Sequence, residues 1–106
     1  MAKREKNSFK LKLKELGFKR YTDYLKSDHW EKFRKDYWKS HKKTCCCCKK
    51  AALDLHHLTY KHLGKEKKTD VVALCRNCHD KVHKIIREHK IPLNNAHKIV
   101  RSIMQL

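Results

Sequence analysis

Four of the six cysteines stand in two pairs whose spacing suits a tetrahedral metal ion. Each pair has the form C-x-x-C, one inside the run of four consecutive cysteines and the other in the segment CRNC. A structural Zn²⁺ site needs four ligands such as thiolates, each about 2.3 Å from the ion, and each C-x-x-C turn supplies two of them. The spacing therefore predicts a structural zinc held by Cys45, Cys48, Cys75 and Cys78. Cys46 and Cys47 are expected to fill apolar space, although either could replace a neighbour as a ligand.

Histidines are concentrated in the same part of the chain, with five of the nine between residues 56 and 83. His56 and His57 are neighbours in the segment AALDLHHL, which reads as a strand, so their side chains should point to opposite faces. His79 and His83 are four residues apart in a segment that reads as a helix, so they share one face and can approach a common ion. One of the adjacent histidines could then be a metal ligand while the other has a different role.

The elements that must position these residues follow from the pattern of apolar side chains. Ser27 is suited to cap a helix over residues 28–40, whose inner face would carry aromatic side chains. AALDLHHL and VVAL read as two strands around a polar loop, and residues 77–90 read as a helix that Pro92 ends. A last helix is expected after Asn94 or Asn95, with the apolar residues Ile99, Val100 and Ile103.

The N-terminal residues give a weaker pattern. The first seven are expected to form a solvated basic arm, followed by a short helix over residues 8–16. Alternating apolar side chains in that second segment are also compatible with a strand.

Charge is the strongest feature of the composition, since 28 Lys and Arg against 11 Asp and Glu give a net charge of +17. Such a chain is expected to bind polyanions, with nucleic acid first among them. No apolar run approaches the roughly 18 residues of a membrane span, and the N-terminus lacks the apolar stretch of a secretory signal. We therefore expect a cytoplasmic protein with reduced cysteines and no membrane partner.

The segment LDLHHLTYKHLGKEKKTDVVALCRNCHDKVH closely resembles the signature of HNH endonucleases, in the subfamily with two zinc-binding C-x-x-C pairs. The upstream YLKSDHWEKFRKDYW followed by TCCCC is similar to the lead-in helix of that subfamily. The resemblance covers about residues 24–83. It implies an α+β fold of the small ββα-metal type, treble-clef-like, with flanking helices, and it implies hydrolysis of phosphodiester bonds in a prokaryotic or phage-encoded protein.

The resemblance also implies roles for individual residues. His56 corresponds to the first metal ligand, His57 to the general base and His83 to the helix ligand, while His79 is a possible further ligand. The catalytic ion would be divalent, such as Mg²⁺, Mn²⁺ or Ni²⁺. Asp70 stands where the signature has Asn, and it could either brace the loop or ligate the ion.

Glu66 and Asp54 are weaker candidates, since a loop charge and a strand-edge charge explain them as well. The remaining histidines are expected at the surface; they are His29, His41, His62, His89 and His97.

Three parts are expected: a basic arm or short helix over 1–23, a nuclease domain over 24–90, and a C-terminal helix over 91–106 packed on it. Phosphate contacts are expected from Lys3, Arg4, Lys6, Arg34, Lys49 and Lys50. DNA is the expected substrate, with RNA possible, and the protein would act as a monomer or homodimer. The alternative function is a zinc-ribbon module that binds nucleic acid without cutting it. That alternative explains the charge and the cysteines, but not the two histidine pairs.

Overall fold

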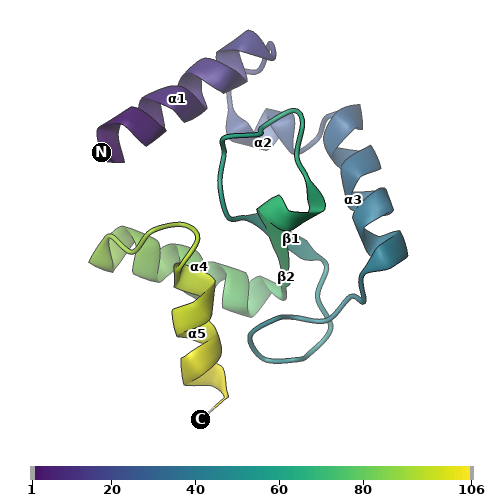
Figure 1. Ribbon diagram of the computed structural model, residues 1–106, viewed down its shortest axis with the longest axis vertical. Helices are drawn as coiled ribbons and strands as arrows, with labels where there is room; N and C mark the ends of the chain where they lie inside the picture. The colour runs from purple at the N-terminus through teal and green to yellow at the C-terminus, as the bar shows by residue number, and fades with distance from the viewer. Residues whose placement is uncertain (1, 106) are drawn as a thin grey trace.

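Two strands form an antiparallel hairpin at the centre of the fold (Figure 1). β1 (Asp54–His57) pairs with β2 (Val71–Leu74), so that His56 lies opposite Val72 and His57 lies opposite Val71. β2 is the VVAL segment, whose β-branched residues favour extended backbone. Three of the four residues in each strand are buried, because helices cover both faces of the hairpin.

The computed structural model describes the backbone of residues 2–105 and the side chains of residues 9–105, and within that range it has five α-helices and one 3₁₀ helix. In Figure 1, α1 and α2 lie above the hairpin and α3 lies to its right, whereas α4 lies to its left and α5 below. None of the described helices combines the length and the apolar character needed to cross a membrane. The helices are α1 (Ala2–Glu15), α2 (Tyr21–Tyr24), α3 (Asp28–Ser40), η1 (Lys68–Asp70), α4 (Arg76–His89) and α5 (Ala96–Met104).

The helix predicted over residues 28–40 is confirmed as α3, with the predicted cap. The Ser27 hydroxyl oxygen accepts a hydrogen bond from the backbone N–H of Trp30 at 3.2 Å, which satisfies one of the free donors of the first turn. Trp30 and Tyr37 are buried, and the ring of Phe33 stacks on Trp30. This aromatic face packs against the His57 side of the hairpin, where Trp30 stacks on the His57 ring.

The ends of the chain differ from the prediction. α1 begins at Ala2, so the backbone of the first residues belongs to the helix that is predicted only over residues 8–16. Leu13 is buried, while Leu11 is 59% exposed. The helical spacing of Phe9 and Leu13 therefore decides the conformation, not the alternation of Phe9, Leu11 and Leu13. The short helix α2 has no counterpart in the sequence prediction.

α5 is present as predicted, but it buries a narrower face than its apolar residues suggest. Asn95 occupies the N-cap position without a side-chain capping bond. Ala96 and Val100 are buried against α4, whereas Ile99 and Ile103 are 39% and 59% exposed.

Candidate metal centres

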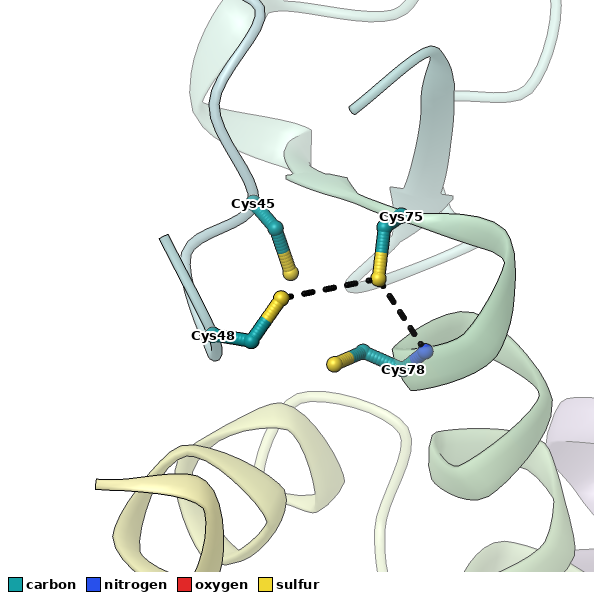
Figure 2. Close-up of side chains that lie close together, drawn as sticks. All are labelled: Cys45, Cys48, Cys75 and Cys78. Atoms are coloured by element: carbon teal, nitrogen blue, oxygen red, sulfur yellow. Dashed lines mark hydrogen bonds between the residues drawn. The ribbon is translucent and has the colours of Figure 1, made fainter. Parts of the chain in front are cut away.

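The four predicted cysteines converge at the end of the hairpin (Figure 2). Cys45 and Cys48 lie in the turn between α3 and β1, Cys75 directly follows β2, and Cys78 lies in the first turn of α4. Their sulfur atoms all lie within 4.8 Å of one another. The Sγ atoms of Cys48 and Cys75 are 3.7 Å apart, close to the roughly 3.8 Å that separates two sulfurs of a tetrahedral site with 2.3 Å metal–sulfur bonds. The four thiols could therefore hold a metal ion, and zinc suits this ligand set.

The backbone around these cysteines favours thiolate ligands. The N–H of Cys47 donates to Cys45 Sγ and the N–H of Cys78 donates to Cys75 Sγ, both at 3.4 Å. Lys49 adopts a left-handed φ of 69°, which closes the turn so that its N–H donates to the Cys45 carbonyl at 3.0 Å. Burial raises the pKa of the Cys45 thiol, but nearby backbone donors outweigh burial and lower that pKa to about 6.

The other two cysteines lie outside this group. Cys47 is fully buried, and its thiol donates to the His97 carbonyl at 3.3 Å. Burial raises the pKa of Cys47 to about 12, so this side chain stays a protonated thiol and acts as apolar filler. Cys46 is half-buried, and burial raises its pKa as well.

Three histidines form a second cluster between β1 and α4. Each of His56, His79 and His83 offers one ring nitrogen, and these nitrogens lie within 4.8 Å of one another. The Nε2 atoms of His79 and His83 are 3.1 Å apart. Two imidazole nitrogens bound to one tetrahedral zinc at about 2.0–2.1 Å would lie roughly 3.3 Å apart, so the two rings already have the spacing of a shared metal ion.

Hydrogen bonds outside the cluster orient two of these rings. Asp54 accepts a hydrogen bond from His79 Nδ1 at 3.0 Å, which leaves Nε2 of His79 as the nitrogen with the free lone pair. Arg76 in turn holds the Asp54 carboxylate, with 3.3 Å between Nε and Oδ2. His56 Nε2 donates to the Leu93 carbonyl at 3.2 Å, which leaves its Nδ1 for a ligand. Carboxylate and carbonyl partners of this kind are typical of metal-binding histidines.

Two of the three histidines have a lowered pKa. Burial, together with the neighbouring His83 and His79, lowers the pKa of His56 to about 3. Burial lowers the pKa of His83 as well, with His79 and Arg87 adding to the effect. Both imidazoles are therefore neutral near pH 7, and a neutral imidazole is the species that ligates a cation.

His57 lies on the opposite face of β1 and does not join this cluster. Its ring is 2% exposed and packs between α2 and α3. Nδ1 lies 2.7 Å from the Tyr21 hydroxyl and Nε2 lies 2.9 Å from Glu66 Oε2, so both ring nitrogens have partners. Burial raises the pKa of Tyr21, which keeps its phenol protonated and able to donate to Nδ1. In this arrangement His57 has no free nitrogen to take a proton from water, and a general-base role would require the Tyr21 hydroxyl to leave.

Glu66 is the centre of the polar network around His57. Its carboxylate is 1% exposed and accepts hydrogen bonds from His57, from the Tyr24 hydroxyl at 2.5 Å and from His29 Nε2 at 2.9 Å. Burial raises the pKa of Glu66, but the bonds from His57, Tyr24 and His29 outweigh burial and lower that pKa to about 2. The backbone N–H of Gly64 donates to the same carboxylate, so the network fixes the β1–β2 loop to α2 and α3.

Replacing Glu66 with glutamine is expected to lower the free energy of unfolding by about 1–3 kcal/mol, because one acceptor becomes a donor that faces other donors in a buried site. Urea unfolding of the metal-loaded protein measures this loss. Glu31→Gln is the matched control, since Glu31 is 63% exposed and pairs only with Lys35 across one helical turn, and it should change stability by less than about 0.5 kcal/mol. Equal stabilities of the two variants would contradict a structural role for the Glu66 network.

Asp70 lies apart from both metal clusters among the described residues. Its Oδ2 accepts hydrogen bonds from the Lys67 N–H at 2.8 Å and from His62 Nδ1 at 3.1 Å, and its carbonyl accepts from the Leu58 N–H at 2.7 Å. Of the two roles open to Asp70, the geometry matches bracing of the loop and not metal ligation.

The structure describes the side chains of three of the six residues that are expected to contact phosphate. Arg34 is half-buried and donates to the Leu53 carbonyl at 2.9 Å, which ties α3 to the start of β1. Lys49 and Lys50 are exposed at the cysteine turn. The side chains of the others lie outside the described part; they are Lys3, Arg4 and Lys6.

Four residues of these sites are predicted weakly or not at all by the sequence pattern. Asp54 and Glu66 are weak candidates from the sequence, but each carboxylate accepts a hydrogen bond from a histidine. Tyr21 lies in an unpredicted helix, and no sequence signal connects it to His57, 36 residues away. His97 was expected at the surface, yet it is 8% exposed, and among the described atoms its Nδ1 has no hydrogen-bond partner. The helical spacing of His97 and Val100 on the inner face of α5 could have indicated this burial.

Comparisons of the chain with protein-family models, with curated proteins and with solved structures found no match.

Proposed function

We propose that this chain is a metal-dependent endonuclease of the HNH type that hydrolyses phosphodiester bonds in DNA. The observation that carries the proposal is the convergence of His56, His79 and His83 between a hairpin and the following helix, beside a four-cysteine cluster at the same helix's first turn. That order of hairpin, helix and two metal-ligand sets is what the ββα-metal resemblance implies. The four cysteines would hold a structural zinc.

The two clusters suit different tasks. Four thiolates complete a tetrahedral shell, so the cysteine site is closed and structural. Three imidazoles leave at least one coordination position open, as in hydrolytic metal sites. A divalent ion bound there would polarise a phosphoryl oxygen and lower the pKa of a coordinated water. The chain's own contribution is to orient His79 through Asp54 and His56 through the Leu93 carbonyl.

His57 does not carry the proton transfer in this proposal, because it is buried with both ring nitrogens bonded. Its role here is to join the hairpin to α2 and to the β1–β2 loop through Tyr21 and Glu66.

The substrate class follows from charge. A net charge of +17 on 106 residues attracts a polyanion, and a divalent ion coordinated by neutral histidines adds further positive charge at the site. DNA is the proposed substrate, and hydrolysis that does not use a 2′-hydroxyl extends to RNA.

Binding to duplex DNA is expected to weaken steeply with salt. Each phosphate contact releases about 0.9 counterions, so log affinity should fall linearly with log salt concentration and depend little on sequence. Fluorescence anisotropy of a labelled duplex measures the slope. The protein carries zinc at the four cysteines, and no further divalent ion is added, so that the duplex is not cleaved during the titration. An affinity unchanged between roughly 50 and 200 mM salt would contradict backbone-dominated binding.

A nucleic-acid-binding module without catalysis is the second candidate function, and the burial of His57 favours it. In that case the four-cysteine site and the basic surface would be sufficient, and the three histidines would bind a second ion only for stability.

Cleavage of supercoiled plasmid distinguishes the two functions. The zinc-loaded protein is incubated with plasmid in parallel reactions, each of which contains Mg²⁺, Mn²⁺, Ni²⁺ or EDTA. Nicked or linear plasmid that requires a divalent ion supports the nuclease. Plasmid that is bound but left intact with every ion would replace the nuclease with the binding module.

A further inference from the structure

One arginine extends the line of metal-site histidines along α4. His79, His83 and Arg87 follow one another at intervals of four residues, so their side chains lie on one face of the helix in successive turns. Arg87 is exposed. The ion pairs between the described residues do not include it. Arg87 lies one helical turn beyond His83, so its guanidinium can reach the space beside the cluster.

We propose that Arg87 binds a phosphate oxygen of the nucleic-acid backbone beside the three-histidine site, so that the guanidinium and the bound ion together form one anion site. This inference rests on the proposed function, because it needs the divalent ion at His56, His79 and His83. The phosphodiester is the group that the ion and the guanidinium would bind together.

Arg87 and an ion at the three histidines interact through their charges. A guanidinium one helical turn from a divalent cation repels that cation, so Arg87 disfavours the loaded metal site when no anion is present. A phosphate placed between the two removes the repulsion and gains from both charges. The guanidinium also offers donors in a planar fork that matches two phosphate oxygens.

The carboxylates near this face do not cancel the charge. Asp54 is bonded to His79 and Arg76 at the other end of the cluster. Asp80 lies seven residues before Arg87, roughly 10.5 Å along the helix axis, and Glu88 lies with Lys84 and Ile85 on the side of α4 that faces α5. The Arg87 guanidinium and an ion at the three histidines could therefore bind an external anion at the C-terminal side of the cluster.

The test compares Arg87→Gln with Lys81→Gln, which removes the same charge from the opposite face of α4. Titration calorimetry with Ni²⁺ on the zinc-loaded protein, without nucleotide, measures the three-histidine site. Arg87→Gln should bind Ni²⁺ about two- to tenfold more tightly than the parent, because a repulsive charge is gone. Lys81→Gln should stay within about twofold of the parent, because its charge lies farther from the site.

The second arm titrates a thymidine dinucleotide into the Ni²⁺-loaded protein. Arg87→Gln should lose about tenfold or more in affinity, the usual effect of removing a hydrogen bond between charged groups. Arg87→Lys should restore the parent's Ni²⁺ affinity but only part of the dinucleotide affinity, because an ammonium lacks the fork. A dinucleotide with an uncharged methylphosphonate should not distinguish the parent from Arg87→Gln.

The outcomes separate this inference from the proposed function. If Ni²⁺ binds to the parent but the Arg87 and Lys81 variants match each other in both titrations, the phosphate site is wrong while the metal site remains. If Arg87→Gln shows both changes but the parent cuts no plasmid, the anion site stands and the nuclease proposal fails. A parent that binds no Ni²⁺ through its histidines overturns both.

Discussion

Replacing Cys75 with serine should release the structural metal and leave the domain largely unfolded at 25 °C. A structural zinc contributes about 10–16 kcal/mol of apparent binding free energy in small zinc domains, which matches or exceeds the roughly 5–15 kcal/mol of total stability of a typical domain. Cys75 also caps α4, since its sulfur accepts the Cys78 N–H, and it connects β2 to that helix. The loss therefore affects the hairpin and the helix together. Zinc content by elemental analysis and the near-ultraviolet circular dichroism signal measure it.

Cys46→Ser is the matched control, because Cys46 is half-buried in the same run but lies outside the four-sulfur group. It should keep one zinc per chain and change stability by no more than about 1 kcal/mol, as for an ordinary substitution. A Cys75→Ser protein that is folded and free of zinc would overturn the structural site. Zinc loss in Cys46→Ser instead would move one ligand along the run.

Replacing His83 with alanine should remove the second divalent ion and reduce plasmid cleavage by about 10³-fold or more, because the ion supplies several kcal/mol of stabilisation to the transition state. The zinc at the cysteines should remain. His83 is only half-buried, so its loss should disturb folding less than loss of His56, which is 1% exposed. Ni²⁺ titration and cleavage rates over a range of metal concentrations measure the effect, and part of the activity should return at high metal concentration.

His89→Ala is the control for this variant, since His89 lies exposed in the last turn of the same helix. It should cut at the parent's rate. Cleavage by His83→Ala at the parent's rate and metal dependence would remove the three-histidine site from the reaction. The binding of a single metal ion by the parent would have the same consequence.

His57 shows how far local pattern and tertiary packing diverge. Strand alternation correctly predicted that His56 and His57 face opposite sides, because successive side chains of any strand do so. Alternation does not say what covers each face. The partners of His57 come from α2 and from the β1–β2 loop, and the contacts of Tyr21 and Glu66 with this ring are set by how three separate segments pack.

The sequence by itself determined the features that depend on short spacing. Two C-x-x-C turns, the helical pair His79 and His83, the Ser27 cap and the β-branched strand are local, and each occurs in the structure where the pattern placed it. Local backbone geometry fixes such relations, since helix and strand periodicity hold wherever the element forms.

Only the tertiary structure decided which residues are the hydrogen-bond partners of the histidines, and which polar side chains are buried. Asp54 meets His79 across 25 residues, Leu93 meets His56 across 37, and Glu66 meets His57 through a loop. Whether a loop carboxylate is a solvated charge or the centre of a buried network depends on the apolar surfaces that close around it. The free energy of burying such a carboxylate depends on packing and desolvation over the whole domain. A short segment of sequence therefore cannot predict it.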